Sequence, residues 1–465
     1  MVVIQRKQQD KGESDPRAIS LEVVYNVMEK GAYTNIALDR YLKRSDLSPG
    51  DRHLVTEIVN GSIRMMKHLD WVLNLFLQKP LHTQNPWLKN VLRVSLYQML
   101  FMNKIPDYAC VNSAVDLTRK KAGNKLSGVA NGVLRNVSRN RDSIKYPEPV
   151  DSIEYLAVYY SQPEWLVQKC VHDYGPEYTA NMLQYFNHRP TLILRNNCLS
   201  GSRNELIDAL RTEGINCQAS NRTPWGLSVE GMDKSLENLT AYQEGRFYVQ
   251  NEASMLAVSI LNPQIGENII DLCSGVGGKT SFIAEQMNNI GKIDAYEIYE
   301  HKLELLAANC ARLHISIVEG HHQDILGTIE GLKVAQGVLL DVPCSGLGVL
   351  NRRADSRWRK TPDSISDLHR IQYSLLERAS QMVARNGRLV YSTCTFNHEE
   401  NQQIVTEFLG NNPAFELDGF AGEVAFFPFD DQDIESAAEG MLTLLPGKYD
   451  TDGMFYARMR RIRSN

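Results

Sequence analysis

The sequence predicts a multidomain protein with an N-terminal all-α bundle, a small α+β insert and a C-terminal α/β Rossmann-like domain. A chain of 465 residues exceeds one ordinary hydrophobic core, so two or three domains are expected. Apolar residues recur at helical spacing in the first part, whereas strand-like and helix-like segments alternate after residue 247. We place the domains at residues 1–145, 146–246 and 247–465.

The N-terminal part consists of successive amphipathic helices. Leu21, Val24 and Met28 recur at helical intervals, and the apolar run 91–100 predicts a helix in the centre of the bundle. Asp51 is expected to cap a helix that begins beside it. These patterns predict a helical domain of ordinary size.

The insert begins after the proline-rich stretch 146–149, which interrupts the helical pattern. We expect helices at 163–186 and 203–211, and strands at 191–195 and 226–229. For Arg195 and Arg203 we expect either contact with nucleic acid or a solvated position.

The C-terminal part alternates short apolar runs with helical segments, which predicts a doubly wound parallel sheet. The expected strands are 268–272, 292–296, 315–319, 337–340, 387–392, 443–445 and 453–459. The expected helices are 279–287, 301–313, 365–384 and 399–409. No helix separates the last two strands, so we expect them to form an antiparallel edge pair.

Charge is distributed unevenly along the chain. Residues 1–150 carry 23 Lys and Arg and 14 Asp and Glu, whereas the remainder is acidic. Basic residues cluster within 119–141 on predicted helices. Such a cluster predicts contact with a polyanion, and the alternative is a solvated basic surface.

Eight cysteines without a C-x-x-C pair argue against a disulfide framework or a structural zinc site. The first ten residues lack an apolar signal core, and no apolar run reaches membrane-spanning length. We therefore expect a cytoplasmic monomer with reduced thiols, no bound metal and no membrane association.

The segment N-I-I-D-L-C-S-G-V-G-G-K-T, residues 268–280, predicts a buried strand, a glycine loop and a helix. Gly275, Gly277 and Gly278 allow the backbone to approach a ligand closely. The spacing matches neither a dinucleotide fingerprint nor a phosphate loop. In this fold a ligand binds outside the strand's carboxyl end.

Three acids follow successive predicted strands, where this fold places its ligand contacts. Glu297 is suitably placed to accept hydrogen bonds from a ribose diol, and Asp324 lies within reach of an adenine amino group. Asp341 ends the next strand. Their shared position predicts a nucleoside-containing ligand.

Two cysteines also follow predicted strands, Cys344 in L-D-V-P-C-S-G-L-G and Cys394 in Y-S-T-C-T-F-N-H-E-E-N. Cysteine is commonly a small core residue, but polar neighbours such as Ser345 and Thr393 are unusual packing partners. A thiolate at such a position indicates nucleophilic chemistry.

These motifs resemble the Sun-type RNA cytosine-5 methyltransferases. The residues that carry the resemblance are Asp271-Leu272-Cys273, Gly277-Gly278-Lys279-Thr280, Asp341, Pro343-Cys344-Ser345-Gly346, Ser392-Thr393-Cys394, Glu399-Glu400-Asn401, Gln250-Asn251-Glu252-Ala253-Ser254 and Asp452-Gly453-Met454-Phe455-Tyr456-Ala457. The N-terminal part is similar to the helical, NusB-like domain of the bacterial branch acting on 16S ribosomal RNA. There the matching residues are Asp51-Arg52, Gly61, Arg64, Leu69-Asp70-Trp71 and Asn131-Gly132-Val133-Leu134-Arg135.

The resemblance implies transfer of a methyl group from S-adenosyl-L-methionine to carbon 5 of a cytosine in small-subunit ribosomal RNA. It implies that Cys394 is the nucleophile, that Cys344 assists product release, and that Asp341 and Lys279 hold the base. DNA cytosine methyltransferases instead use a Pro-Cys cysteine as nucleophile, so the motifs alone leave this assignment open. The implied cofactor contacts are Cys273, Ser274, Gly275, Val276, Gly277, Gly278, Lys279, Glu297, Asp324 and Asp341.

We expect RNA contacts in the loop 351–361 and in the basic helical cluster. The residues are Arg352, Arg353, Arg357, Arg119, Lys120, Lys121 and Arg135. For the loop 351–361, the alternative is a solvated charged segment. Two further hypotheses are a tRNA substrate with the same catalytic residues, and a catalytically idle RNA-binding ribosome assembly factor.

One departure from the family concerns the cofactor loop. Where the family has Cys-Ala-Ala-Pro-Gly-Gly-Lys, this chain has Cys273-Ser274-Gly275-Val276-Gly277-Gly278-Lys279. Proline fixes φ and glycine frees it, so this loop is expected to be looser in the free protein. The affinity for the methyl donor is the property that this change affects.

Overall fold

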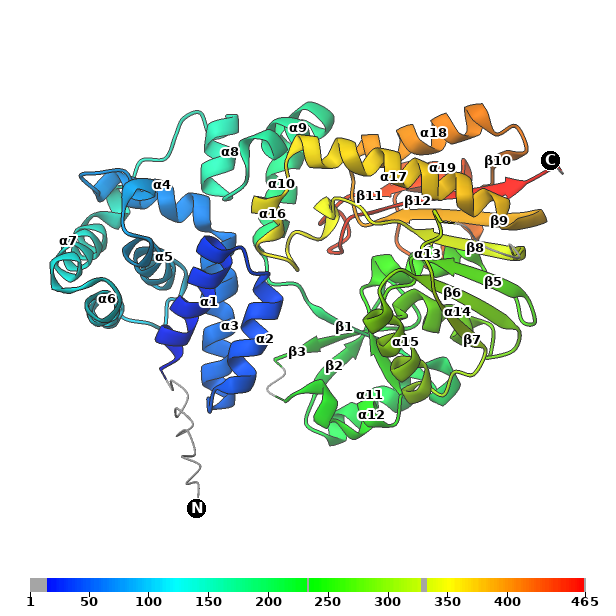
Figure 1. Ribbon diagram of the computed structural model, residues 1–465, viewed down its shortest axis with the longest axis horizontal. Coiled ribbons are helices and arrows are strands. Elements are labelled where there is room, and N and C mark those ends of the chain that lie inside the picture. Colours follow the sequence, from blue (N-terminus) through cyan, green and yellow to red (C-terminus); the bar gives the residue numbers. More distant parts are fainter. Residues whose placement is uncertain (1–14, 232–233, 328–332, 464–465) are drawn as a thin grey trace, which may run out of the picture. The chain divides into compact units, whose positions relative to one another are not determined.

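The computed structural model describes residues 15–231, 234–327 and 333–463, and these divide into two compact units (Figure 1). The first comprises Met1–Asn187 and Asn351–Arg359, and the second His188–Leu350 and Lys360–Asn465. The first ten residues, in which no signal core is expected, lie outside the described part. The three-domain boundaries given above remain predictions.

The first unit is entirely helical where it is described. Its helices are α1 (Pro16–Lys30), α2 (Thr34–Arg44), α3 (Pro49–Arg64), α4 (Met66–Phe76), α5 (Pro86–Phe101), α6 (Asp107–Ala122), α7 (Asn124–Asn140), α8 (Ile153–Tyr159), α9 (Glu164–Tyr174), α10 (Pro176–Asn187) and α16 (Ser356–Arg359), with short 3₁₀ turns η1 (Leu81–Thr83) and η2 (Arg141–Ser143). As predicted, α5 lies in the core, because nearly all its residues from Leu88 to Met99 are buried.

The cap of α3 differs from the prediction. Ser48 is the N-cap, and its hydroxyl accepts a hydrogen bond from the Asp51 backbone N–H. Asp51 therefore lies in the first helical turn, where its negative charge favours the positive helix end. The proline at position 49 explains the earlier start, since proline suits the first turn of a helix.

Two residues of the NusB-like motifs stabilise the bundle. Asp70 in α4 accepts two hydrogen bonds of 2.6 Å from the Arg93 guanidinium in α5. Gly61 in α3 allows Tyr97 to pack directly on its backbone, because a Cβ there would lie 1.9 Å from the Tyr97 Cζ atom. Both positions fix how helices adjoining α5 pack against it.

The second unit begins with a small antiparallel sheet in the order β2-β3-β1-β4. Its elements are β1 (Leu192–Asn196), η3 (Cys198–Ser200), α11 (Arg203–Thr212), β2 (Asn216–Ala219), β3 (Gly226–Glu230), η4 (Leu236–Asn238), α12 (Thr240–Gln243) and β4 (Phe247–Val249). This succession of strands and helices is that of a ferredoxin-like domain.

The larger sheet follows, in the order β10-β12-β9-β8-β5-β6-β7, and β11 pairs with β12. The strands are β5 (Asn268–Leu272), β6 (Lys292–Glu297), β7 (Val318–His322), β8 (Ala335–Asp341), β9 (Val383–Thr393), β10 (Phe415–Leu417), β11 (Met441–Leu444) and β12 (Met454–Arg461). The helices are α13 (Glu252–Leu261), α14 (Gly278–Gln286), α15 (Glu300–Arg312), α17 (Pro362–Gln381), α18 (Gln402–Asn411) and α19 (Asp431–Ala438), with 3₁₀ turns η5 (Leu347–Val349), η6 (His398–Glu400) and η7 (Ala421–Val424).

Strands β5 to β9 are parallel, and their side chains alternate between two buried faces. Ile269 packs with residues of α13 to α15, whereas Ile270 packs with residues of α17 and α18. This alternation explains the continuous apolar runs of the sequence. The predicted fold class is confirmed.

Three details of the larger sheet differ from the predictions. Strand β7 begins at Val318 rather than at residue 315, because the Ile315 N–H bonds back to Cys310 and closes the end of α15. Strand β10, with three residues, carries too short a pattern to be predicted. The last two strands are antiparallel as expected, but β12 lies inside the sheet, between β9 and β10.

No helix within the described residues is long and apolar enough to cross a membrane.

Candidate active site

The glycine loop connects β5 to α14 at the carboxyl end of the parallel strands. Its conformation requires glycine at two positions, since φ is 60° at Gly275 and 88° at Gly277. A Cβ at Gly277 would also lie 3.0 Å from Leu306, so α15 packs closely beneath the loop. The Asn309 side-chain amide donates to the Val276 carbonyl at 3.0 Å and holds the loop from the same helix.

Two acids lie at or just beyond the ends of β6 and β7. Glu297 ends β6, is buried, and accepts hydrogen bonds from the backbone N–H groups of Gly275 (3.0 Å) and Tyr299 (3.1 Å). Asp324 lies just beyond β7 and is exposed. With Asp341 at the end of β8, the acids therefore occupy the ends of neighbouring strands, as the fold prediction requires.

Exposed apolar side chains accompany these acids, and the sequence reasoning missed them. Ile298 is 51% exposed immediately after Glu297, Leu326 is 46% exposed two residues after Asp324, and Val276 is 38% exposed in the loop itself. Apolar side chains beside polar acceptors suit a ligand with a flat ring and a sugar. The sequence could have indicated these three apolar residues, because each lies one or two positions after a strand-end acid or a loop glycine.

The two cysteines meet at the ends of β8 and β9. Their sulfur atoms are 3.1 Å apart, and the Cys394 backbone N–H points to the Cys344 sulfur at 3.3 Å. The strands are parallel neighbours, with Asp341 paired to Ser392, so residues just past both strand ends come together. The structure thus brings together two side chains fifty residues apart in the chain.

Lys279 and Asp341 lie next to this pair. The Lys279 ammonium is 2.5 Å from an Asp341 carboxylate oxygen, and the Ser392 hydroxyl donates to the other oxygen at 2.8 Å. Burial alone would lower the pKa of Lys279, but the negative charge of Asp341, with contributions from Cys394 and Asp271, raises it. Lys279 therefore carries a positive charge, which favours an anionic group beside it.

Cys344 is a neutral thiol at neutral pH. Its hydrogen bond with Cys394, its burial and the charges of Cys394, Glu400 and Asp341 all raise its pKa. A protonated thiol suits a group that donates a proton better than one that attacks. Cys273 is no candidate nucleophile either, because burial, aided by the Asp341, Asp271 and Glu297 charges, raises its pKa to about 12.

A buried carboxylate, Glu400, joins the two cysteine loops. It accepts hydrogen bonds from the Ser345 backbone N–H (2.8 Å) and hydroxyl (2.5 Å), next to Cys344. It also accepts from the side-chain amides of Gln372 (3.0 Å) and of Asn397 (3.1 Å), three residues beyond Cys394. Glu400 belongs to the family motif, but only its contacts show that it joins the two loops.

The predicted RNA-contacting loop is partly integrated into the helical unit. Arg357 is buried, and its guanidinium donates to the Ser161 and Phe186 carbonyls and to the Asn187 side chain. The prediction of an RNA contact is therefore wrong for Arg357, because the side chain is buried and its terminal nitrogens donate to protein acceptors. Arg352 and Arg353 are exposed.

The basic helical cluster lies on α6 and α7, and its residues differ in their surroundings. Arg119 pairs with Asp116, and the Arg135 guanidinium donates to Asn131, both on exposed surfaces. Lys120 is exposed in the same helical turn as Arg119. Lys121 pairs with Glu22 and lies over the Trp87 ring, so much of its charge is already neutralised.

For Arg195 both expected alternatives are wrong, because the side chain is neither solvated nor available to nucleic acid. For Arg203, which is partly buried, the two alternatives remain predictions. Arg195 is fully buried in the second unit. Arg203 donates to three backbone carbonyls, those of Ser220, Thr223 and Gly226.

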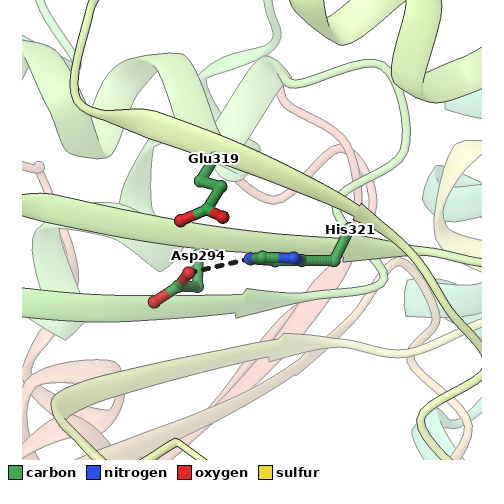
Figure 2. A group of neighbouring side chains, drawn as sticks. All are labelled: Asp294, Glu319 and His321. Carbon is green, nitrogen blue, oxygen red and sulfur yellow. Dashed lines mark hydrogen bonds and ion pairs between the residues drawn. The ribbon is translucent and has the colours of Figure 1, made fainter.

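Asp294, Glu319 and His321 form a cluster of a type that could hold a metal ion (Figure 2). The His321 ring contacts an Asp294 oxygen at 2.8 Å, and the Lys333 ammonium contacts the same oxygen at 2.6 Å. Lys292 lies 2.7 Å from Glu319. Because two ammonium groups already neutralise both carboxylates, the cluster is a network of ion pairs.

This sheet, with a glycine loop and acids at successive strand ends, defines the class of S-adenosylmethionine-dependent methyltransferases. Family models match the chain at 14–139 (NusB family), at 162–233 (Methyltr_RsmF/B-like, ferredoxin-like domain) and at 258–460 (16S rRNA methyltransferase RsmB/F). The chain is 34% identical over 447 residues to a probable ribosomal RNA small subunit methyltransferase B of Synechocystis, with 96% of this chain and 99% of the relative covered.

The corresponding protein of Bacillus subtilis (strain 168) is 32% identical over 454 residues, with 96% of this chain and 98% of that protein covered. Among solved structures, that of PH0851 matches with a TM-score of 0.79 and 27% identity, and covers 97% of this chain and all of that one. The chain therefore belongs to the RsmB/F methyltransferase family, and its cofactor is S-adenosyl-L-methionine.

Proposed function

We propose that this protein methylates carbon 5 of a cytosine in 16S ribosomal RNA through a covalent bond between Cys394 and carbon 6 of the base. The observation that carries the proposal is the contact of the Cys344 and Cys394 sulfurs, 3.1 Å apart, beside the Lys279–Asp341 ion pair. The names of the relatives support the substrate, since they are ribosomal RNA small subunit methyltransferases.

The cofactor loop, residues 273–278, and Glu297, Asp324 and Asp341 would hold S-adenosylmethionine. The open space over Gly275, where a Cβ would meet no atom within 4 Å, supports the proposal that the cofactor binds against this loop. The Glu297 carboxylate has further lone pairs for a ribose diol, and Ile298 and Leu326 offer apolar surface to the adenine. When bound, the cofactor supplies an electrophilic methyl group on a sulfonium.

Carbon 5 of cytosine is a poor nucleophile until a thiolate adds to carbon 6. The Cys394 sulfur forms that bond, and the electron pair of the 5,6 double bond moves to carbon 5, which takes the methyl group. A base then removes the carbon 5 proton, the double bond reforms, and the bond between Cys394 and carbon 6 breaks. Lys279 favours the Cys394 thiolate by its charge, and Cys344 gives its proton to the Cys394 sulfur as that sulfur leaves carbon 6.

Asp341 would bind a ring nitrogen of the cytosine. Lys279 and Ser392 orient its carboxylate, and remaining lone pairs can accept a hydrogen bond from a protonated ring nitrogen. By stabilising the proton on the ring nitrogen, the carboxylate would make the ring more electron-poor and carbon 6 more electrophilic. Because the base must leave any stack to reach the thiol, we propose a single-stranded or loop target.

The helical unit would bind the RNA backbone through Arg119, Lys120, Lys121 and Arg135, with Arg352 and Arg353 on the segment after Cys344. The NusB-family match of this region supports ribosomal RNA over tRNA as substrate. A cytoplasmic location and a monomeric state remain predictions.

Two variants test the chemistry. Cys394→Ala removes the nucleophile, so methyl transfer is expected to fall below detection. Cys344→Ala keeps the nucleophile but impairs release, so a covalent RNA–protein adduct is expected on denaturing gels. The reverse pattern would show that the two roles are exchanged, and no adduct with either variant would refute the covalent mechanism.

Bisulfite sequencing of ribosomal and transfer RNA from cells with and without the protein tests the substrate. Loss of one methylated cytosine in 16S RNA is expected. Loss confined to tRNA would assign the alternative substrate. Unchanged RNA together with undetectable cofactor binding by calorimetry would favour the catalytically idle assembly factor.

A further inference from the structure

Arg195 belongs to β1 of the ferredoxin-like sheet, yet its guanidinium is buried against the helix that follows the cofactor loop. It donates to both carboxylate oxygens of Glu285 in α14, at 2.6 and 3.1 Å. Another guanidinium nitrogen donates to the Gly278 carbonyl at 2.8 Å. Gly278 is the last residue of the cofactor loop and the first of α14.

The remaining contacts leave Arg195 with a single orientation. The guanidinium also donates to the Ser281 hydroxyl at 2.9 Å and to the Gln250 side-chain oxygen. It lies over the rings of Tyr248 (5.2 Å) and Phe282 (4.7 Å). A rigid planar donor that packs on two rings and donates along its edge is well suited to hold a loop in place.

Its partner Gln250 begins the family motif Gln250-Asn251, and the adjacent Asn251 extends toward the thiols. The Asn251 amide donates to Asp452 at 2.7 Å. The neighbouring Gly453 N–H bonds to the Gly348 carbonyl, and the Gly348 N–H bonds to the Cys394 carbonyl. The consecutive residues Gln250 and Asn251 therefore connect Arg195 to the backbone of Cys394. Because Arg195 also bonds to the cofactor loop, the loop is part of this connection.

We propose that Arg195 is a positioning residue for the cofactor loop. It fixes the Gly278 carbonyl and the first turn of α14, and so keeps residues 273–278 in the conformation that binds S-adenosylmethionine. The loop lacks the family's proline, so this chain relies on contacts from outside the loop to limit its conformations. The inference rests on the proposed cofactor role of that loop.

Arg195→Lys tests the proposal, because lysine retains the charge opposite Glu285 but cannot reach Glu285, Gly278 and Gln250 together. The matched control is Arg458→Lys in β12. Arg458 is also a buried arginine of the second unit, paired with Glu423 and bonded to the Ile260 carbonyl, and it has no contact with the loop. Both variants are expected to lower the melting temperature by similar amounts.

The discriminating measurement is calorimetric titration of the full chain with S-adenosylhomocysteine, well below the melting temperature of each variant. Arg195→Lys should raise the dissociation constant about tenfold or more, whereas Arg458→Lys should leave it within about twofold. The KM for S-adenosylmethionine should rise with little change in kcat. Faster hydrogen exchange of the amides at 274–281 should accompany this change.

Unchanged affinity in Arg195→Lys, or an equal loss in Arg458→Lys, would overturn the inference. If Arg195→Lys does not fold, Gln250→Leu removes one acceptor of the guanidinium and should give a smaller loss of affinity in the same direction. Glu297→Ala separates this inference from the proposed site. If Glu297→Ala weakens binding and Arg195→Lys does not, only the inference fails, and if neither weakens binding the proposed cofactor site fails as well.

Discussion

The two halves of the candidate site hold their residues by different means. The thiol half, residues 341–348 and 392–401, consists of loops joined by buried side-chain hydrogen bonds. Its buried polar residues are Ser345, Ser392, Thr393, Thr395, Asn397, Glu400 and Asn401. In the cofactor half, residues 272–279, 297–299 and 324–326, three loop residues (Cys273, Gly275 and Gly277) have a positive φ, and Val276, Ile298 and Leu326 are exposed.

This difference follows from what each half must do. In the proposed reaction the two thiols have different roles at the same base and need a fixed separation, which a buried network specifies because each unmade hydrogen bond is costly. A cofactor that enters and leaves at every turnover needs an accessible surface, and a glycine-rich backbone supplies it. The comparison predicts that the two halves respond differently to substitution.

The largest effect is expected from Glu400→Gln in the thiol half. Glutamine keeps the shape but presents an N–H₂ group to donors that now bind the carboxylate, so the Ser345 and Asn397 loops should shift apart. We expect kcat to fall about 100-fold, since small displacements of reacting groups have such effects. Affinity for S-adenosylhomocysteine should stay within about twofold.

The control for Glu400→Gln is Glu407→Gln on α18, an exposed acid 3.7 Å from His369, which should leave both quantities unchanged. If Glu400→Gln instead lowers cofactor affinity as much as activity, the two halves are not independent and the comparison fails.

An intermediate effect is expected from Asp271→Asn beneath the cofactor loop. Burial, opposed by Thr280 and Lys279 and aided by the Asp341 and Glu297 charges, raises the pKa of Asp271 to about 7. The folded state therefore holds a proton that the unfolded state releases near its ordinary value of 3.8. The resulting stabilisation is fully present at lower pH and is lost as pH rises toward 7.

Asparagine cannot titrate, so the melting temperature of the wild type relative to Asp271→Asn should fall by roughly 3 °C between about pH 5 and pH 8. Thermal unfolding at several pH values measures this difference. A flat profile for Asp271→Asn would show that Asp271 is ionised throughout.

The smallest effect is expected from Val276→Pro, which restores the family's proline. Fixing φ in the free loop should tighten binding of S-adenosylhomocysteine about two- to fivefold, because less conformational freedom is lost on binding. Val276→Ala removes the same side chain without restricting φ and is the control. Weaker binding by Val276→Pro than by Val276→Ala would mean that the loop needs a φ that proline cannot adopt.

Most of the fold could be predicted from the sequence, because the patterns that specify it are local. The run 268–272 coincides with β5, and the segments predicted for β6, β8 and β9 lie within those strands, whereas the segment predicted for β7 overlaps it only at 318–319. The short strand β10 and the interior position of β12 were not anticipated, since pairing partners are not encoded within a three-residue pattern. The helix cap at Ser48 was missed because two suitable caps, Ser48 and Asp51, lie within one turn.

Charged residues show most clearly where sequence reasoning fails. Arg352, Arg353 and Arg357 belong to one basic stretch, yet only Arg357 is buried. Its acceptors are about 170 to 200 positions away in the chain, at Ser161, Phe186 and Asn187. Arg195 is likewise buried against an acceptor that is distant in the chain, since its partner Glu285 is 90 residues away.

The sequence by itself determined the succession of strands and helices, and placed the acids and cysteines at strand ends, because hydrophobic periodicity and glycine content act over a few residues. The carboxyl ends of parallel strands lie at one edge of the sheet, so the sequence already implied that these acids and cysteines belong to one site. Only the tertiary structure decided that Cys344 and Cys394 touch, that Glu400 joins their loops, and that Arg195 and Arg357 are buried. A charged side chain is buried only where distant backbone and side-chain acceptors satisfy it, and no local pattern specifies those partners.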